Sequence, residues 1–181
     1  MARAHPVDPP TTGVAVIVHL GDATAVLVSC VAWALIGVLT GVGWVAVDRS
    51  RLQHDGWLTR PRRFEDDGRW YRRRLRICAW KDRLPEMGDL FPGGTSKRRL
   101  PGTSTEALLA FAAETRRAEL VHWSNMAAGP LFFLWCPPLL GTCMVVFGVV
   151  AHLPFISIQR YNRFRLEAIV ARRARLGRTS T

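Results

Sequence analysis

A short segment, Glu114 to Trp123, holds the densest group of side chains able to do acid–base chemistry. If it is helical, a turn of 100° per residue places Thr115, Glu119 and His122 within about 60° of one another. A carboxylate can orient one imidazole nitrogen while the other nitrogen takes a proton from a hydroxyl group. The competing interpretation is structural, with Glu119 paired to Arg116 and His122 reaching toward a membrane interface.

Two further polar clusters could complete such a site. The first, Trp80 to Glu86, alternates charged and apolar residues before a Pro/Gly-rich stretch, and a solvated turn is its structural alternative. The second, Gln159 to Arg163, follows a long apolar block, where arginine and tyrosine can simply anchor a helix end.

Common enzyme signatures do not occur in this sequence. It contains no GxSxG, GxxxxGK[ST], HExxH or HxxxxD motif. A metal at Glu119-x-x-His122 is disfavoured, because di-iron bundles need two such pairs and two further glutamates. The cysteines Cys30, Cys78, Cys136 and Cys143 show neither CxxC spacing nor the density of a disulfide scaffold. We therefore expect no metal and no cofactor.

These residues must be positioned by long apolar segments. The segment 23–47 has no charge and as a helix would be about 37 Å long, enough to cross a membrane. Between Leu120 and Ile158 only two histidines, apart from cysteines, are ionisable. A single helix of that length would be about twice as long as the membrane is thick. Pro137 and Pro138 predict a hairpin with helices at 119–136 and 139–158.

The sequence thus predicts an all-α polytopic membrane protein with about three transmembrane helices. The expected parts are an external N-terminal arm (1–22), a first transmembrane helix (23–48), a cytoplasmic basic segment (49–117), a transmembrane helical hairpin (118–159) and a basic cytoplasmic tail (160–181). Ser104 should cap a helix that runs into the second span, after a Pro/Gly-rich break at 85–102. Pro130 and Pro154 should kink the hairpin helices.

The charge distribution sets the orientation. Of 25 Lys and Arg residues, 17 lie between Asp48 and Ala118 and seven follow Gln159. The positive-inside rule then predicts a multi-pass protein of the inner (plasma) membrane with a cytoplasmic C-terminus, and it disfavours nucleic acid as the reason for a net charge of +11. Two alternatives stay open: a cleaved signal peptide in place of the first span, and a re-entrant pair in place of the hairpin.

Four segments, taken together, resemble the family of glycosyl-4,4'-diaponeurosporenoate acyltransferases over most of Phe64 to Arg175. The segments are Phe64-Glu65 with Gly68; Trp80-Lys81 with Leu84; Glu114-Thr115, Arg117-Ala118-Glu119-Leu120 and His122-Trp123; and Gln159-Arg160-Tyr161-Asn162-Arg163 with Arg165-Leu166. The chain departs from the staphylococcal pattern at Phe164, where that pattern has proline, and in a more arginine-rich approach to Trp80.

The resemblance implies transfer of a fatty acyl group, from acyl-CoA or another donor, to a sugar hydroxyl of a membrane-embedded glycolipid or glycosylated carotenoid. It implies His122 as general base, with Glu119 and Thr115 beside it. The substrate-binding candidates are Arg117, Arg160 and Arg163 for the donor, Lys81 and Asp82 for closing the site, and Trp80, Trp123, Tyr161 and Asn162. The alternative is a non-catalytic membrane scaffold or assembly subunit whose arginines bind anionic lipid. The sequence predicts no oligomeric state.

Overall fold

The computed structural model describes residues 17, 18, 20–84 and 102–179, and every regular element in these ranges is helical. This confirms the all-α prediction, while the predicted break at 85–102 falls almost wholly outside the described residues. The elements, in order, are α1 (Asp22–Val45), η1 (Arg49–Leu52), η2 (Arg63–Gly68), α2 (Arg69–Arg73), η3 (Ile77–Ala79), η4 (Lys81–Arg83), α3 (Thr105–Ala127), η6 (Gly129–Leu134) and α4 (Pro138–Thr179).

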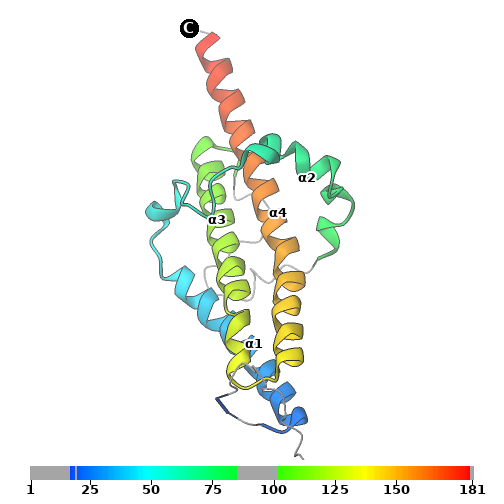
Figure 1. The fold of residues 1–181 in the computed structure, drawn as a ribbon. Coiled ribbons are helices and arrows are strands. Elements are labelled where there is room, and N and C mark those ends of the chain that lie inside the picture. Colours follow the sequence, from blue (N-terminus) through cyan, green and yellow to red (C-terminus); the bar gives the residue numbers. More distant parts are fainter. Residues whose placement is uncertain (1–16, 19, 85–101, 180–181) are drawn as a thin grey trace, which may run out of the picture.

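The three long helices pack as a bundle in which α3 runs antiparallel to both α1 and α4 (Figure 1). Trp44 Nε1 donates to Ser124 Oγ at 2.9 Å near one end, and Trp135 Nε1 donates to Ser29 Oγ at 3.0 Å near the other. The chain from α3 through η6 therefore follows the whole length of α1. We call the end with the 128–138 turn the apolar end, and the end where α1 stops the basic end.

The helix α3 begins as predicted and ends earlier than predicted. Ser104 Oγ accepts a hydrogen bond from the backbone N–H of Ala107 at 3.1 Å, which caps the helix. The predicted continuation to Cys136 was wrong, because α3 stops at Ala127. Pro130 cannot donate a backbone hydrogen bond and follows a glycine, so the chain continues as the 3-10 turn η6. By contrast, α4 continues through Pro154.

Two helices in the described part of the chain are long and apolar enough to cross a membrane, Asp22–Val45 and Pro138–Arg178. Two of the about three predicted transmembrane helices are therefore found in the described part of the chain. The helix α3 does not meet the same test, because it carries Glu106, Glu114, Arg116, Arg117 and Glu119, while the apolar residues after Ala128 lie in η6.

The apolar faces of these two helices point outward. Only 17% of the residues in the most apolar stretch of each helix are buried. The large exposed side chains include Leu27 and Leu39 on α1 and Leu139 and Val150 on α4. A core helix of a soluble protein would be mostly buried, so this exposure supports association with a membrane.

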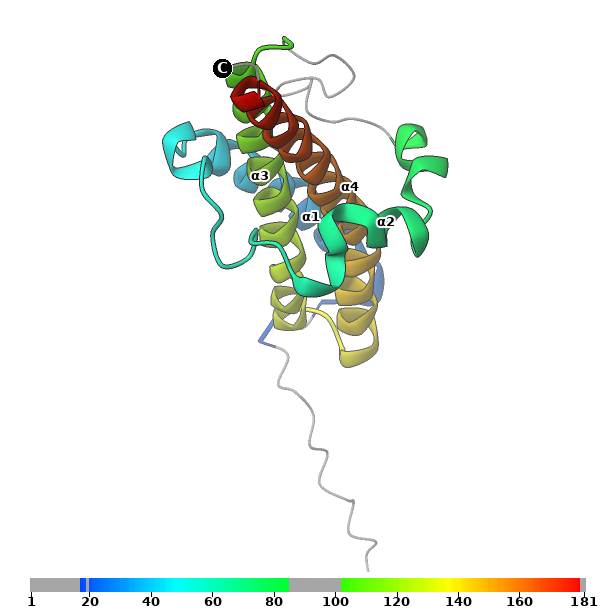
Figure 2. The same cartoon turned by 90° about the horizontal axis from the view of Figure 1, so that it is seen from above.

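At the basic end, the short helical turns between Arg63 and Arg83 pack beside α4, outside the bundle (Figure 2). Their core consists of Tyr71 and Ile77 against Ile158, Tyr161 and Phe164. Gly68 has φ +83°, and a Cβ there would lie 3.0 Å from Phe164 Cβ, so this close contact requires glycine.

Candidate functional site

Two arginines of α4 meet one carboxylate of α3 inside the basic end. Arg160 Nη1 donates to Glu119 Oε1 at 2.5 Å, and Arg163 Nη1 donates to Glu119 Oε2 at 2.6 Å. Trp123 Nε1 also donates to Glu119 Oε1, at 3.3 Å. The Glu119 side chain is fully buried and the two arginine side chains are 7% and 2% exposed. A buried ion pair of this kind holds its members in a fixed geometry.

A second buried carboxylate, Glu65, extends the cluster through the same arginine. Arg160 Nε and Nη2 donate to its two oxygens at 2.6 and 2.8 Å, which is a bidentate pair. The Tyr71 hydroxyl donates to Oε1 at 2.5 Å, and the backbone N–H of Arg62 donates to Oε2. We call Glu65, Glu119, Arg160 and Arg163 the ion network.

The environment of Glu65 keeps it ionised. Burial alone would raise its pKa, but the hydrogen bonds from Arg160, Tyr71 and the Arg62 backbone outweigh burial and lower the pKa below the ordinary value. The same burial, together with the adjacent Glu65 carboxylate, raises the pKa of Tyr71, which stays a hydrogen-bond donor.

The ion network also fixes the loop that crosses it. Arg160 Nη1 and Nη2 donate to the carbonyls of Leu58 and Arg60 at 3.0 and 2.7 Å. Arg163 Nη2 donates to the carbonyl of Thr59 at 2.6 Å. Arg160 therefore uses all five of its N–H groups on protein acceptors. This arginine acts as a cross-link between α3, α4 and the 58–65 segment.

The predicted base His122 lies on α3 against α4. Its Nδ1 is 3.1 Å from Nδ1 of His152, and its ring stacks on Phe155 with ring centroids 4.8 Å apart. One of the two Nδ1 atoms must carry the proton of this contact. His152 had no predicted role, although it and His122 are the two ionisable residues, apart from cysteines, between Leu120 and Ile158.

The other predicted residues of α3 have mixed surroundings. Thr115 is buried and its hydroxyl donates to the Ala112 carbonyl at 2.7 Å. Arg116 pairs with Asp55 and Glu167, so the alternative pairing of Arg116 with Glu119 was wrong.

Arg117 lies close to the C-terminal end of α1. It pairs with Glu114 at 2.8 Å and donates to the carbonyl of Val47 at 3.1 Å. Its buried Nε has no hydrogen-bond partner among the described residues.

The remaining candidates lie around the ion network rather than in it. Trp80 is half-buried and donates to the Leu75 carbonyl at 2.8 Å, and Lys81 pairs with Asp82 at 2.5 Å on the surface. Tyr161 is buried with its hydroxyl 3.2 Å from Cys78 Sγ, and Asn162 is half-buried on α4. No group of three or more potential ligands in the described residues could hold a metal ion.

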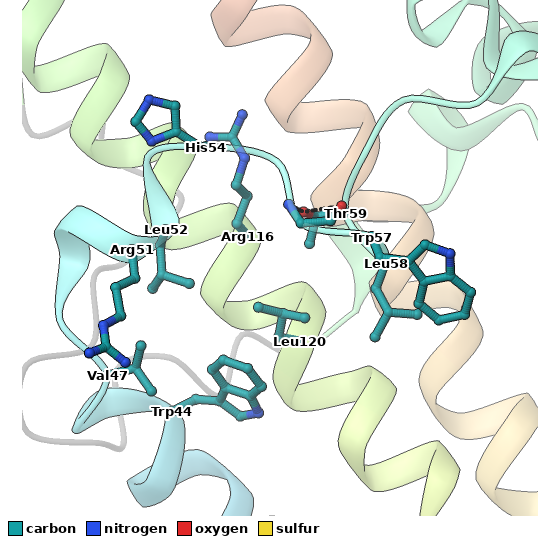
Figure 3. Close-up of a pocket in the computed structure, with 11 residues that line it drawn as sticks. Trp44, Val47, Arg51, Leu52, His54, Trp57, Leu58, Thr59, Arg116 and Leu120 are labelled. Atoms are coloured by element: carbon teal, nitrogen blue, oxygen red, sulfur yellow. Dashed lines mark hydrogen bonds between the residues drawn. The ribbon is translucent and has the colours of Figure 1, made fainter.

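A cavity of about 530 Å³ opens beside the network, between the end of α1, the 51–59 loop and α3 (Figure 3). Its apolar walls are formed by Trp44, Val47, Leu52, Trp57, Leu58 and Leu120. Arg51, His54 and Arg116 supply its basic groups, and Gly56 and Thr59 complete the lining. The sequence did not predict this cavity, because its lining residues come from three separate segments without a shared motif.

The structure thus brings together Glu119, Trp123, Arg160 and Arg163, and adds Glu65 and Tyr71 to them. Glu65 was part of the family resemblance, but its partner could not be read from the sequence. Arg160 lies 95 positions away from Glu65, and only the packing of the 58–65 segment on α4 joins them.

Comparison with known proteins gives one family. The family model described as glycosyl-4,4'-diaponeurosporenoate acyltransferase matches residues 54–172. A relative of that name from Staphylococcus haemolyticus is 36% identical over 104 residues, which cover 58% of this chain and 60% of the relative. One from Staphylococcus aureus is 28% identical over 107 residues, covering 59% of this chain and 64% of the relative.

These matches leave part of each protein uncompared. The chain spans about 60% of the length of these curated relatives. No solved structure matches the chain. The matched region contains the ion network, His122 and His152, and it leaves out α1.

Proposed function

The chain belongs to the glycosyl-4,4'-diaponeurosporenoate acyltransferase family, and on that basis we propose that it is a membrane acyltransferase. It would move a fatty acyl group from a cytoplasmic donor to a hydroxyl of a membrane-embedded glycolipid or glycosylated carotenoid. The observation that carries the proposal is that the matched region contains both a buried ion network and a histidine pair, in a bundle with two membrane-length helices.

The proposed topology places the basic end at the cytoplasmic face of the plasma membrane. α1 and α4 would cross, and α3 with η6 would run between them, so that the C-terminal tail is cytoplasmic. Exposed arginines at the basic end and exposed apolar residues over the rest of the bundle support this orientation. Lipid is then a partner along the exposed apolar faces of α1 and α4.

In the proposed reaction, His122 is the general base. Because its Nδ1 faces His152, Nε2 takes the proton from the acceptor hydroxyl. The hydroxyl oxygen attacks the acyl carbonyl of the donor, and the bond from that carbon to the donor's leaving group breaks. With a thioester donor, the imidazolium returns its proton to the departing thiolate. Such base catalysis contributes about 10²- to 10⁴-fold in rate.

The arginines divide into two roles. Arg160 and Arg163 are positioning residues, since their side chains are buried and bonded to protein acceptors. Arg117, which lies beside Val47 and has a side chain that is 13% exposed, is the better candidate for the donor's anionic group. Glu119 positions α3 through both arginines. Lys81 and Asp82, which pair with each other at the surface, stay the candidates for closing the site.

The test is acyl transfer by the purified protein in phosphatidylcholine nanodiscs. Radiolabelled palmitoyl-CoA and a glycosylated carotenoid acid are supplied, and the acylated product is identified by mass spectrometry. The wild type should form an ester on the sugar, and His122→Ala should lower the rate about 10²-fold or more while the protein still folds.

His152→Ala is the companion variant, expected to reduce the rate less and to shift the pH–rate profile, because it changes the partner of Nδ1 but leaves Nε2 in place. If the folded wild type transfers no acyl group while binding anionic lipid, the scaffold alternative replaces the enzyme. If His122→Ala keeps the normal rate, the base is another residue.

A further inference from the structure

We propose that the cavity between α1, the 51–59 loop and α3 is the binding site for the fatty acyl chain of an anionic acyl donor. This inference rests on the proposed function and names the place and chemistry of its donor. The cavity volume of about 530 Å³ lies in the range usual for ligand sites, and six of its lining residues are large and apolar.

The cavity walls come from elements that the bundle already fixes. Trp44 is held at the end of α1 by its hydrogen bond to Ser124, and Leu120 lies on α3, one residue after the buried Glu119. Leu52 is buried in η1. The cavity is therefore preformed on one side and needs no rearrangement of the helices.

The ion network satisfies two backbone carbonyls of the loop that forms one wall of the cavity. The carbonyls of Leu58 and Thr59 accept hydrogen bonds from Arg160 and Arg163. These backbone acceptors are thus satisfied away from the cavity, while the side chains of Trp57 and Leu58 line it (Figure 3). An unpaired carbonyl in the lining would penalise a hydrocarbon chain, and the arginines remove that penalty.

The basic groups of the cavity indicate an anionic head group on the ligand. Arg51 is exposed, His54 is exposed, and both line the cavity. Arg117 approaches the same place through the Val47 carbonyl. An acyl-CoA carries phosphates that arginine side chains attract, whereas a glycosylated acceptor with neutral hydroxyls would gain nothing from them. The donor rather than the acceptor is therefore the ligand that fits.

The level of the cavity along α1 also agrees with an amphipathic ligand at a membrane boundary. Trp44 occupies the last turn of a membrane-length helix, the level at which tryptophan commonly lies in membranes. A chain entering here would lie on the hydrocarbon side of the arginines, with its head group on the cytoplasmic side.

The experiment uses palmitoyl-CoA with a diazirine in the acyl chain, added to the full chain in phosphatidylcholine nanodiscs and irradiated. Labelled residues are mapped by mass spectrometry. The label should concentrate on 44–58 and 116–120. Label spread over exposed Leu27, Leu139 and Val150 instead would overturn the site.

Two variants, with one control variant, test the cavity itself. Leu120→Trp fills it and should reduce labelling there about tenfold. Leu139→Trp makes the same change at a side chain that is 80% exposed at the apolar end, and should leave labelling unchanged. Arg51→Glu changes an exposed side chain and should leave the core folded. It should raise the half-saturating probe concentration about threefold. Equal labelling in all three variants and the wild type would contradict the proposal.

The same diazirine chain on phosphatidylglycerol and on phosphatidylcholine distinguishes donor from lipid. Strong labelling by palmitoyl-CoA that neither lipid competes away supports a donor site. Equal labelling by phosphatidylglycerol overturns it in favour of a lipid site. Cavity labelling by palmitoyl-CoA without any acyl transfer would keep this inference and refute the proposed reaction, whereas transfer without cavity labelling would do the reverse.

Discussion

The two ends of the helix bundle are held together by different forces. At the basic end, two carboxylates and two guanidinium groups lie buried, and Arg160 alone makes five hydrogen bonds. At the apolar end, contact is made by aromatic rings and small residues, as where Trp33 stacks on Phe132 with ring centroids 4.8 Å apart. The first kind of contact is directional and the second depends on shape.

The difference shows where the molecule requires fixed geometry. An apolar interface tolerates substitutions that conserve volume, whereas removing one member of a buried ion network leaves the others uncompensated. Because buried ion pairs are often no more stabilising than apolar residues, the ion network is better explained by the positions it fixes. Those positions are the cavity loop and the helix face that bears His122.

The largest effect should come from removing the shared carboxylate. Glu119→Leu leaves Arg160 and Arg163 buried without their common partner and should destabilise the protein by about 3–5 kcal/mol. Denaturant unfolding in detergent measures this. Glu106→Ala, on the exposed first turn of the same helix, is the control and should stay within about 1 kcal/mol. A cost below about 1 kcal/mol for Glu119→Leu would remove the contrast between the ends.

A smaller loss is expected when the charge is kept and the geometry is lost. Arg160→Lys retains one positive charge but cannot make the bidentate contact with Glu65 or reach both loop carbonyls, and should cost about 2–3 kcal/mol. Arg165→Lys is the matched control, because Arg165 is exposed and lies 5.9 Å from the Tyr161 ring centre. Equal stability of the two variants would show that charge alone matters at the basic end.

The apolar end should respond to shape. In Gly148→Ala the new Cβ would lie 2.8 Å from the Trp33 ring, so the ring must move, at a cost of about 1–3 kcal/mol. Gly129→Ala places its Cβ 3.4 Å from Val145, an ordinary contact, and should cost less. Thermal unfolding midpoints compare the two, and the reverse order would contradict the packing described here.

The smallest effect should be the acid dependence of the basic end. The pKa of Glu65 is lowered in the folded protein, so its contribution is present above the ordinary value of 4.5 and is lost as the pH falls through the folded-state pKa. The stability difference between wild type and Glu65→Gln should be constant from pH 7 to about 5 and shrink below 4.5. A difference that grows on acidification would mean that the carboxyl is protonated in the folded state.

The sequence predicted the helical class, the Ser104 cap and the grouping of polar residues at one end, since these depend on local pattern and composition. It failed at the end of α3, where Gly129 and Pro130 stop the helix that hydropathy extends to Cys136. The sequence also could not predict that Glu119 pairs with Arg160 and Arg163. Arg116 and Arg117 lie on the same helix as Glu119, and nothing in the local sequence makes the two arginines of α4 better partners. Only the antiparallel packing of α3 and α4 selects the partners.

The most direct test of the central claim, acyl transfer at the basic end on the cytoplasmic side, uses membrane vesicles of defined orientation. Palmitoyl-CoA does not cross the bilayer, and the glycosylated acceptor is supplied in the membrane of both inside-out and right-side-out vesicles. We expect ester product in inside-out vesicles, greatly reduced by His122→Ala, and little product in right-side-out vesicles until they are opened with detergent. Product formed at equal rates in intact vesicles of both orientations would contradict it.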